Sequence, residues 1–136
     1  MISLGECVEK RLLMKTAPSR SQADKSMLKA RQFLDGAEKA LVARSWDICV
    51  LGAYAAAFNA ALALLERDGW REKSHACVPR YLEKQYPALD WRGLDKYREM
   101  RHTGHYSPDY LATEEDARDI TTFAKRFIAE VKKLLK

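Results

Sequence analysis

The sequence of 136 residues has few of the residues that interrupt helices, with six glycines and four prolines. The prolines lie outside the long stretches of helical periodicity, so many short strands joined by turns are not expected. No internal repeat or low-complexity segment is visible. With 47% hydrophobic and 32% charged residues, the chain has the composition of an ordinary globular protein, which excludes disorder of the whole chain.

Cysteine is also scarce, and the three residues present, Cys7, Cys49 and Cys77, contain no C-x-x-C pair. Their odd number and wide spacing predict neither a zinc site nor a disulfide framework. Cys49 lies inside an apolar run and is interpreted as a small core residue. No metal or other cofactor is expected. Because residues 1–15 lack the apolar segment of a signal peptide, the chain is expected to be cytoplasmic.

The sequence lacks P-loop, G-x-G-x-x-G, H-E-x-x-H and G-x-S-x-G motifs. Its longest apolar segment, from Trp46 to Leu65, has 17 apolar residues among 20. The possible membrane span within it starts at Ile48, has only 18 residues and is interrupted by Gly52 and Asn59. A span needs about 20 strongly apolar residues. A buried central helix is therefore expected, and no membrane association.

Helical periodicity covers most of the chain. The expected helices cover about Gly5–Met14, Ser19 or Ser21 to Ala43, Trp46 to about Arg67, Ser74 to Tyr86, Leu89–His102, and Thr113 to the end of the chain. No strand of consequence is expected. The sequence therefore predicts an all-α bundle of four or five helices in one domain over residues 1–136. The core of this domain is about residues 21–136, and residues 1–20 are a short helix and a loop.

One segment gathers an unusual set of side chains. Residues 96–106 contain two arginines, two histidines and two tyrosines, at the end of a predicted helix and in the loop after it. Arginine offers a planar fork of donors to phosphate oxygens, and histidine exchanges protons near neutral pH. One arginine and one histidine together can cleave RNA without a metal, because the arginine stabilises the charged phosphorane.

The same residues also have a structural interpretation. Arg98 and Arg101 can pair with nearby carboxylates, the tyrosines can pack in the bundle, and His102 and His105 can lie at the surface. His75 is interpreted as a residue at the start of a helix. The pattern leaves the functional and structural interpretations open.

Five pieces of the sequence, in their order and spacing, resemble a known family, the HEPN domains (higher eukaryotes and prokaryotes nucleotide-binding). The resemblance runs from about Cys7 to Leu135. The pieces are SRSQADKSMLKARQFLDGAEKAL, Trp46-Asp47 with GAYAAAFNAALALLERDGW, Lys73-Ser-His75, LDKYREMRHTGHYSPD and EEDARDI. The resemblance implies an antiparallel helical bundle that commonly forms dimers.

The resemblance also implies roles for residues near position 100. Active HEPN ribonucleases have an R-x4–6-H motif, which Arg98 and His105 match with six residues between them, followed after the arginine by the polar Glu99. Many relatives have an R-x4-Y motif instead, which Arg101 and Tyr106 match. That form is associated with binding a nucleotide or a partner. The sequence satisfies both patterns.

Two functions follow from the resemblance, and both stay open. In the first, the chain is a nucleotide- or phosphate-binding module, the homodimeric partner of a minimal nucleotidyltransferase in a toxin–antitoxin-like pair. The binding residues are then Arg98, Arg101, His102 and Tyr106. In the second, the chain is a metal-independent endoribonuclease, in which Arg98 and His105 of two chains meet at a dimer interface and cleave RNA. A helical scaffold without a site is a third interpretation.

Overall fold

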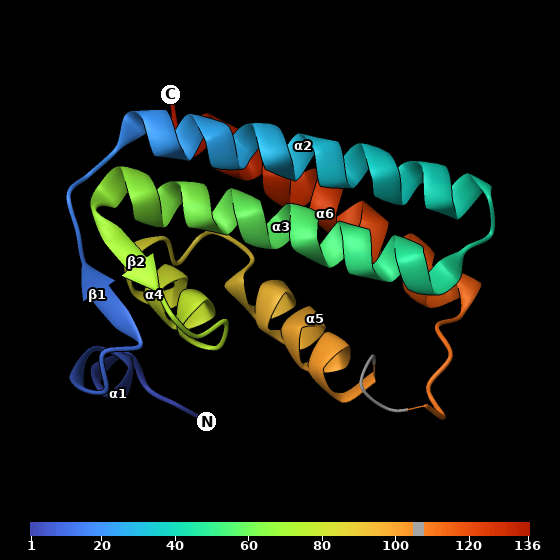
Figure 1. Ribbon diagram of the computed structural model, residues 1–136, viewed down its shortest axis with the longest axis horizontal. Coiled ribbons are helices and arrows are strands. Elements are labelled where there is room, and N and C mark those ends of the chain that lie inside the picture. Colours follow the sequence, from blue (N-terminus) through green and yellow to red (C-terminus); the bar gives the residue numbers. More distant parts are fainter. Residues whose placement is uncertain (105–107) are drawn as a thin grey trace.

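Six helices and one two-stranded sheet make up the regular structure of residues 1–104 and 108–136, which are the residues that the computed structural model describes (Figure 1). In chain order the elements are α1 (Leu4–Glu9), β1 (Leu13–Lys15), α2 (Arg20–Val42), α3 (Trp46–Asp68), β2 (Trp70–Glu72), α4 (Cys77–Gln85), α5 (Trp91–Gly104) and α6 (Glu114–Leu134). The predicted all-α helical bundle is confirmed.

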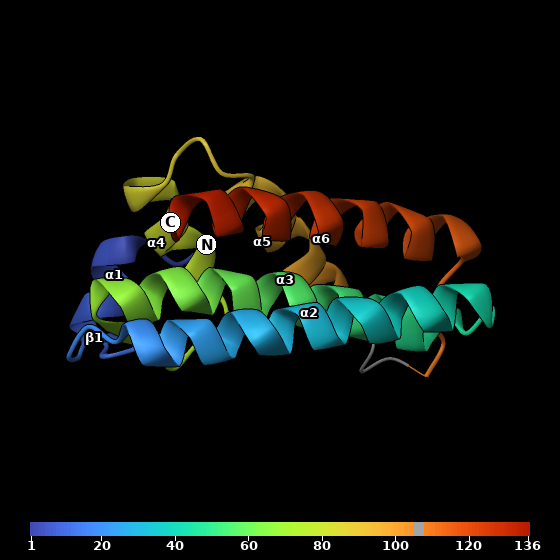
Figure 2. The ribbon, with the colours of Figure 1, turned by 90° about the horizontal axis from the view of Figure 1, so that it is seen from above.

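The long helices run alternately in opposite directions along the molecule. Figure 1 shows α2 and α3 side by side as an antiparallel pair, with α5 beneath α3. Figure 2, seen from above, shows α6 running alongside this pair. α3 packs against α2, α6, α5 and α4, and is therefore the central helix of the bundle. A helix that is apolar nearly all round has to be enclosed in this way.

α3 is long and apolar enough to cross a membrane by length and composition, with a mean hydropathy of 2.0 in its most apolar window. However, 67% of that window is buried inside the bundle. The core helix of a soluble protein passes the same test. The position of α3 confirms the expected buried central helix.

Helix ends follow the capping residues that the sequence offers. The Ser19 hydroxyl accepts a hydrogen bond from the Gln22 amide at 3.0 Å and caps α2. Gly69 ends α3 in the left-handed conformation, with φ of 89°, which favours glycine. Thr113 and Asp116 form a capping box at the start of α6. These local signals therefore set one end of each of the three longest helices.

The N-terminal segment differs from the expectation. The predicted helix from Gly5 to Met14 is wrong beyond Glu9, because the chain turns and residues 13–15 form β1. β1 pairs antiparallel with β2, and its Leu13 is 1% exposed. A three-residue strand has too few residues to show a periodic pattern, and its partner lies far along the sequence. The sheet was therefore not visible in the sequence.

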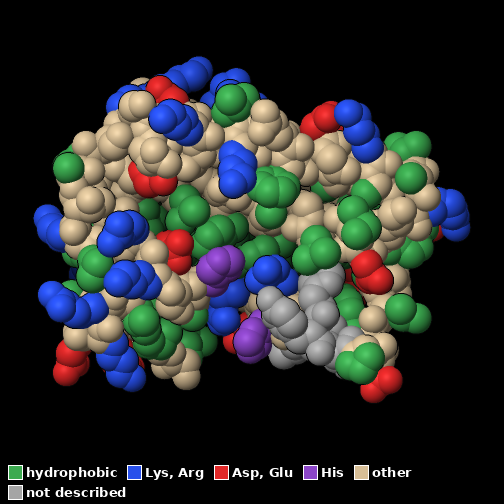
Figure 3. Space-filling model, viewed as in Figure 1, with side chains coloured by type: hydrophobic (Ala, Val, Ile, Leu, Met, Phe, Trp, Pro, Cys, Tyr) green, Lys and Arg blue, Asp and Glu red, His purple; other side chains and the backbone are tan. Residues whose placement is uncertain are grey.

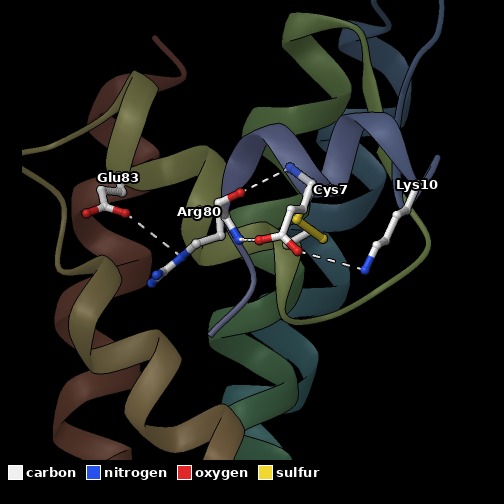
Figure 4. The surroundings of a disulfide bond; sticks show 7 residues. Cys7, Lys10, Arg80 and Glu83 are labelled. Atoms are coloured by element: carbon white, nitrogen blue, oxygen red, sulfur yellow. Dashed lines mark hydrogen bonds and ion pairs between the residues drawn. A yellow bond between two sulfur atoms is a disulfide. The ribbon is translucent and has the colours of Figure 1, made fainter.

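The sheet brings α1 beside α4, where Cys7 and Cys77 form a disulfide bond (Figure 4). This corrects the expectation that the cysteines form no disulfide. The two residues are 70 positions apart, and only the fold brings them together. Cys49 is free and buried in α3, which confirms its interpretation as a core residue.

Candidate functional site

The last two turns of α5 border a cavity of about 430 Å³, here called the α5 cavity. Its lining residues are Ser74, His75, Ala76, Arg98, Arg101 and His102. Three of these, Arg98, Arg101 and His102, were proposed from the sequence. On the same face of the molecule, Figure 3 shows basic and histidine side chains gathered near the middle. The fold therefore brings several basic side chains to one hollow.

Two other residues proposed from the sequence, His105 and Tyr106, lie outside the described residues. The pairings of Arg98 with His105 and of Arg101 with Tyr106 therefore stay predictions. α5 itself extends as a helix to Gly104, slightly beyond the expected end at His102.

Arg98 is held by a network of charges beneath the cavity. Its Nε donates to Asp95 Oδ1 at 3.0 Å, and Asp95 Oδ2 accepts from Arg80 Nη2 at 3.2 Å. The Arg80 residue is 7% exposed, and its guanidinium lies 5.3 Å from the centroid of the Trp91 ring. Asp95 therefore bridges two guanidinium groups, and its hydrogen bond with Nε helps to orient Arg98.

Arg101, one turn further along α5, has a different environment. Within residues 1–104 and 108–136 its guanidinium makes no hydrogen bond or ion pair, and it lies 5.5 Å from the centroid of the buried Tyr54 ring. A guanidinium carries five N–H donors and stays charged at all relevant pH values. With no partner among the described residues, the Arg101 donors can bind an anion in the cavity.

His75 completes the cavity from the turn before α4. Its ring stacks on Phe58 with 3.9 Å between centroids, and its Nδ1 is 3.2 Å from the Tyr54 hydroxyl. Burial of this covered ring, and then the charges of Arg101 and Arg98, lower the pKa of His75. Burial also raises the pKa of the Tyr54 phenol. A neutral histidine and a neutral phenol therefore lie beside the two arginines.

A second hollow, the α3 hollow, adjoins the α5 cavity and has a volume of about 240 Å³. The two share His75 and Arg101. The other lining residues of the α3 hollow are Lys29, Phe33, Tyr54, Ala55, Phe58, Asn59 and Leu62. Together the two hollows form a site that is basic at one end and mostly apolar at the other.

Sequence reasoning missed His75 and Asn59 as residues of this site. The expected helix start at Ser74 is wrong, because α4 begins at Cys77 and His75 lies in the turn before it. The contact of His75 with Tyr54 joins that turn to α3. Asn59 was noted only as an interruption of the apolar run. A lone amide in a central apolar helix was the available signal, because such a group needs a partner or a polar hollow.

The arrangement is suited to an anion rather than a metal ion. Among the described residues there is no group of three or more histidine, cysteine, aspartate or glutamate side chains that could hold a metal ion. Two guanidinium groups at one cavity balance the charge of a phosphate dianion, and each can donate two parallel hydrogen bonds to a pair of phosphate oxygens.

Comparison with protein families gives one match. The family model of the HEPN domain matches residues 23–134, which is most of the chain. No curated protein matches the sequence, and no solved structure matches the fold. The matched range contains both hollows and the whole of α5.

Proposed function

The chain belongs to the HEPN domain family, and from this membership and the cations of the α5 cavity we propose that it is a nucleotide-binding module. In this proposal the α5 cavity holds the phosphate group. The observation that carries it is the Arg101 guanidinium, which lines the cavity without a hydrogen bond or ion pair inside the described part of the chain.

The other groups of the cavity support an anionic ligand. The nearest carboxylate, Asp95, already bridges Arg98 and Arg80, so its charge is compensated. Arg98 Nη2 also donates to Glu99 Oε1 at 3.5 Å. The other N–H groups of Arg98, and those of Arg101, which have no partner among the described residues, are left for phosphate oxygens. His75 adds a neutral hydrogen-bonding group and does not add a charge near pH 7.

Titration of AMP into the protein by isothermal calorimetry tests this proposal. A hydrogen bond to a charged group contributes about 1.5–3 kcal/mol, so Arg101→Ala is expected to weaken binding about tenfold to hundredfold. The matched control is Arg31→Ala, which removes the same charge from an exposed position on α2. Equal affinities of the two variants, or no binding by the wild-type protein, would overturn the proposal.

A second candidate function is metal-independent RNA cleavage, and one observation favours it: His75 and His102 line the same cavity as the two arginines. In this reaction neutral His75 takes the proton of a 2′-hydroxyl, and the 2′ oxygen attacks the phosphorus. The bond from phosphorus to the 5′ oxygen breaks as protonated His102 gives that oxygen a proton. The products are a 2′,3′-cyclic phosphate and a 5′-hydroxyl, and the arginines stabilise the phosphorane.

Incubation of RNA with the protein in EDTA tests this activity. Loss of cyclic-phosphate ends in His75→Ala, with His105→Ala still active, supports cleavage in the α5 cavity. The reverse pattern supports the pair of Arg98 and His105 from two chains. Intact RNA at high concentrations of wild-type protein would rule out both arrangements.

We also propose a homodimer, and a minimal nucleotidyltransferase as its partner, as the family resemblance implies. An uncovered apolar face supports a protein contact, since Ile48 is 61% exposed and Leu51 is 37% exposed on α3. Light scattering should give a dimer mass that falls to a monomer mass in Ile48→Asp. Copurification should recover a nucleotidyltransferase that is encoded beside this chain.

A further inference from the structure

The α3 hollow adjoins the α5 cavity and shares Arg101 and His75 with it. We propose that this hollow is the base subsite of the nucleotide whose phosphate lies in the α5 cavity. The subsite takes an adenine-type base, with an amine beside a ring nitrogen that accepts a hydrogen bond. This inference rests on the proposed function and adds which nucleotide the site selects.

The α3 hollow offers apolar surface to a flat ring. Phe33 on α2 is 36% exposed, and Leu62 on α3 is half-buried. Lys29 Nζ lies 5.9 Å from the centroid of the Phe33 ring, so the rim combines an aromatic ring with a cation. Sites for nucleic acid bases commonly have this combination. The volume, about 240 Å³, lies below the roughly 300–1,000 Å³ of pockets for drug-sized ligands and suits one ring system.

Asn59 supplies the polar group that can recognise the edge of the base. Its Nδ2 donates to the Ala55 carbonyl at 2.8 Å, which occupies one of its two N–H groups. The second N–H and the Oδ1 atom remain, and they give a donor and an acceptor side by side. An asparagine amide pairs in this way with the amine and ring nitrogen of adenine.

The spacing along α3 separates the two ends of the ligand. Tyr54, beneath the Arg101 guanidinium, and Asn59 are five residues apart on one helix. Their Cα atoms are separated by about 7.5 Å along the helix axis and by about 140° around it. Both residues nevertheless line the α3 hollow. A sugar can therefore lie between a phosphate near Arg101 and a base near Asn59.

Calorimetric titration of the wild-type protein with AMP and with ribose 5-phosphate tests the subsite directly. The two ligands carry the same phosphate and differ in the base. Because stacking and hydrogen bonding of a base are lost with ribose 5-phosphate, AMP is expected to bind at least about tenfold more tightly. Equal dissociation constants would overturn the inference.

Substitution of Asn59 tests the selection of the base. Asn59→Asp keeps the shape but leaves only acceptors, which suit the two adjacent donors of guanine. The preference for AMP over GMP should therefore fall about tenfold. Gln85→Glu, which also replaces an amide with a carboxylate but at an exposed position of α4, should leave the preference for AMP over GMP unaltered. An unaltered preference in Asn59→Asp would contradict the role of the amide.

A second pair of variants keeps the test independent of Asn59. Phe33→Ala should weaken AMP binding and leave ribose 5-phosphate binding unaltered, whereas Leu28→Ala, another exposed apolar residue of α2, should change neither.

Failure of the base subsite can be distinguished from failure of the proposed function. If both ligands bind equally and Arg101→Ala weakens both, the base subsite is wrong and the phosphate site stands. If neither ligand binds, the proposed function fails together with the subsite.

Discussion

Two regions meet at His75, and they differ in how many of their polar groups form hydrogen bonds or ion pairs within the protein. The tied region comprises α1, β1, β2, α4 and residues 91–95. It is joined by the Cys7–Cys77 disulfide, the two-stranded sheet and the ion pair of Arg80 with Asp95. The open region comprises Arg101 and the residues of α2 and α3 that line the α3 hollow. There, within the part of the chain that the structure describes, the Arg101 guanidinium makes no hydrogen bond or ion pair, and the Asn59 amide uses one of its two N–H groups.

This difference separates stability from binding. In the tied region the buried Arg80 pairs with Asp95, so removing the carboxylate leaves a buried guanidinium without that partner. In the open region the Arg101 donors, which have no partner among the described residues, and the second N–H of Asn59 contribute little to folding and are available to a ligand. Substitutions in the tied region should therefore lower stability, and substitutions in the open region should lower affinity for the nucleotide.

The largest effect is expected from the disulfide of the tied region. Replacing Cys7 and Cys77 with serine removes a cross-link between residues 70 positions apart. The unfolded chain gains conformational entropy, so the free energy of unfolding should fall by about 4 kcal/mol. Urea denaturation measures this change.

Reductant provides the control for this prediction. It should lower the stability of the wild-type protein and leave that of the double serine variant unaltered. If reductant lowers the free energy of unfolding of the wild-type protein by less than about 1 kcal/mol, the claim that the disulfide stabilises the tied region is contradicted. Thiol alkylation in freshly lysed cells shows whether the bond forms there, and tests the cytoplasmic expectation, because disulfides are typical of oxidising compartments.

A somewhat smaller loss of stability is expected from Asp95→Ala. This change leaves the buried Arg80 without its closest carboxylate, so the free energy of unfolding should fall by about 3 kcal/mol. Asp35→Ala, which breaks an exposed ion pair with Lys39, should cost less than about 1 kcal/mol. Similar values for the two variants in urea denaturation would remove the distinction between the regions.

In the open region, Arg101→Lys should lower affinity and leave stability unaltered. Lysine keeps the charge but loses the planar fork, so the dissociation constant for AMP should rise about tenfold. The free energy of unfolding should stay within about 0.5 kcal/mol of the wild-type value, because Arg101 makes no ion pair in the described structure. A large loss of stability would place Arg101 in the tied region.

The smallest effect concerns pH and has opposite signs for stability and binding. Burial, and then Arg101 and Arg98, lower the pKa of His75 in the folded chain, so the unfolded chain binds the proton more readily. The free energy of unfolding should therefore fall as the pH drops below about 6.5. A bound phosphate favours protonated His75, so the affinity for AMP should rise a few-fold over the same range.

His75→Gln is the reference for both pH measurements. The phosphate group of AMP itself titrates near pH 6, and this contribution is common to the variant and the wild-type protein. The difference between their two pH profiles therefore reports on His75. Identical profiles in calorimetry and in urea denaturation would show that His75 does not titrate beside the arginines.

The helices could be predicted from the sequence because their signals are local. Apolar positions three and four residues apart define α2 and α6, and Ser19, Gly69 and Thr113 lie at the expected caps of α2, α3 and α6. The sheet and the disulfide could not be predicted, since each joins segments that are distant in the sequence. Burial of Leu13 and pairing with β2 outweigh the helical pattern of residues 5–14.

The site could be predicted only where one helix supplies it. Arg98, Arg101 and His102 share a face of α5 because residues three and four apart are neighbours on a helix. His75, Asn59 and Phe33 come from a turn, from α3 and from α2, and tertiary packing alone brings them together.

The most direct test of the central claim is to map AMP binding onto the protein by NMR. With isotope-labelled protein, the side-chain signals of Arg101, His75 and Asn59 should shift together, in proportion to the bound fraction. Adenosine should shift the Asn59 signal and leave the Nε–H signal of Arg98, which lines the α5 cavity and not the α3 hollow, nearly unaltered. Shifts confined to another surface, such as the hollow beside Glu66 and Trp70, would contradict the claim that the α5 cavity binds the phosphate.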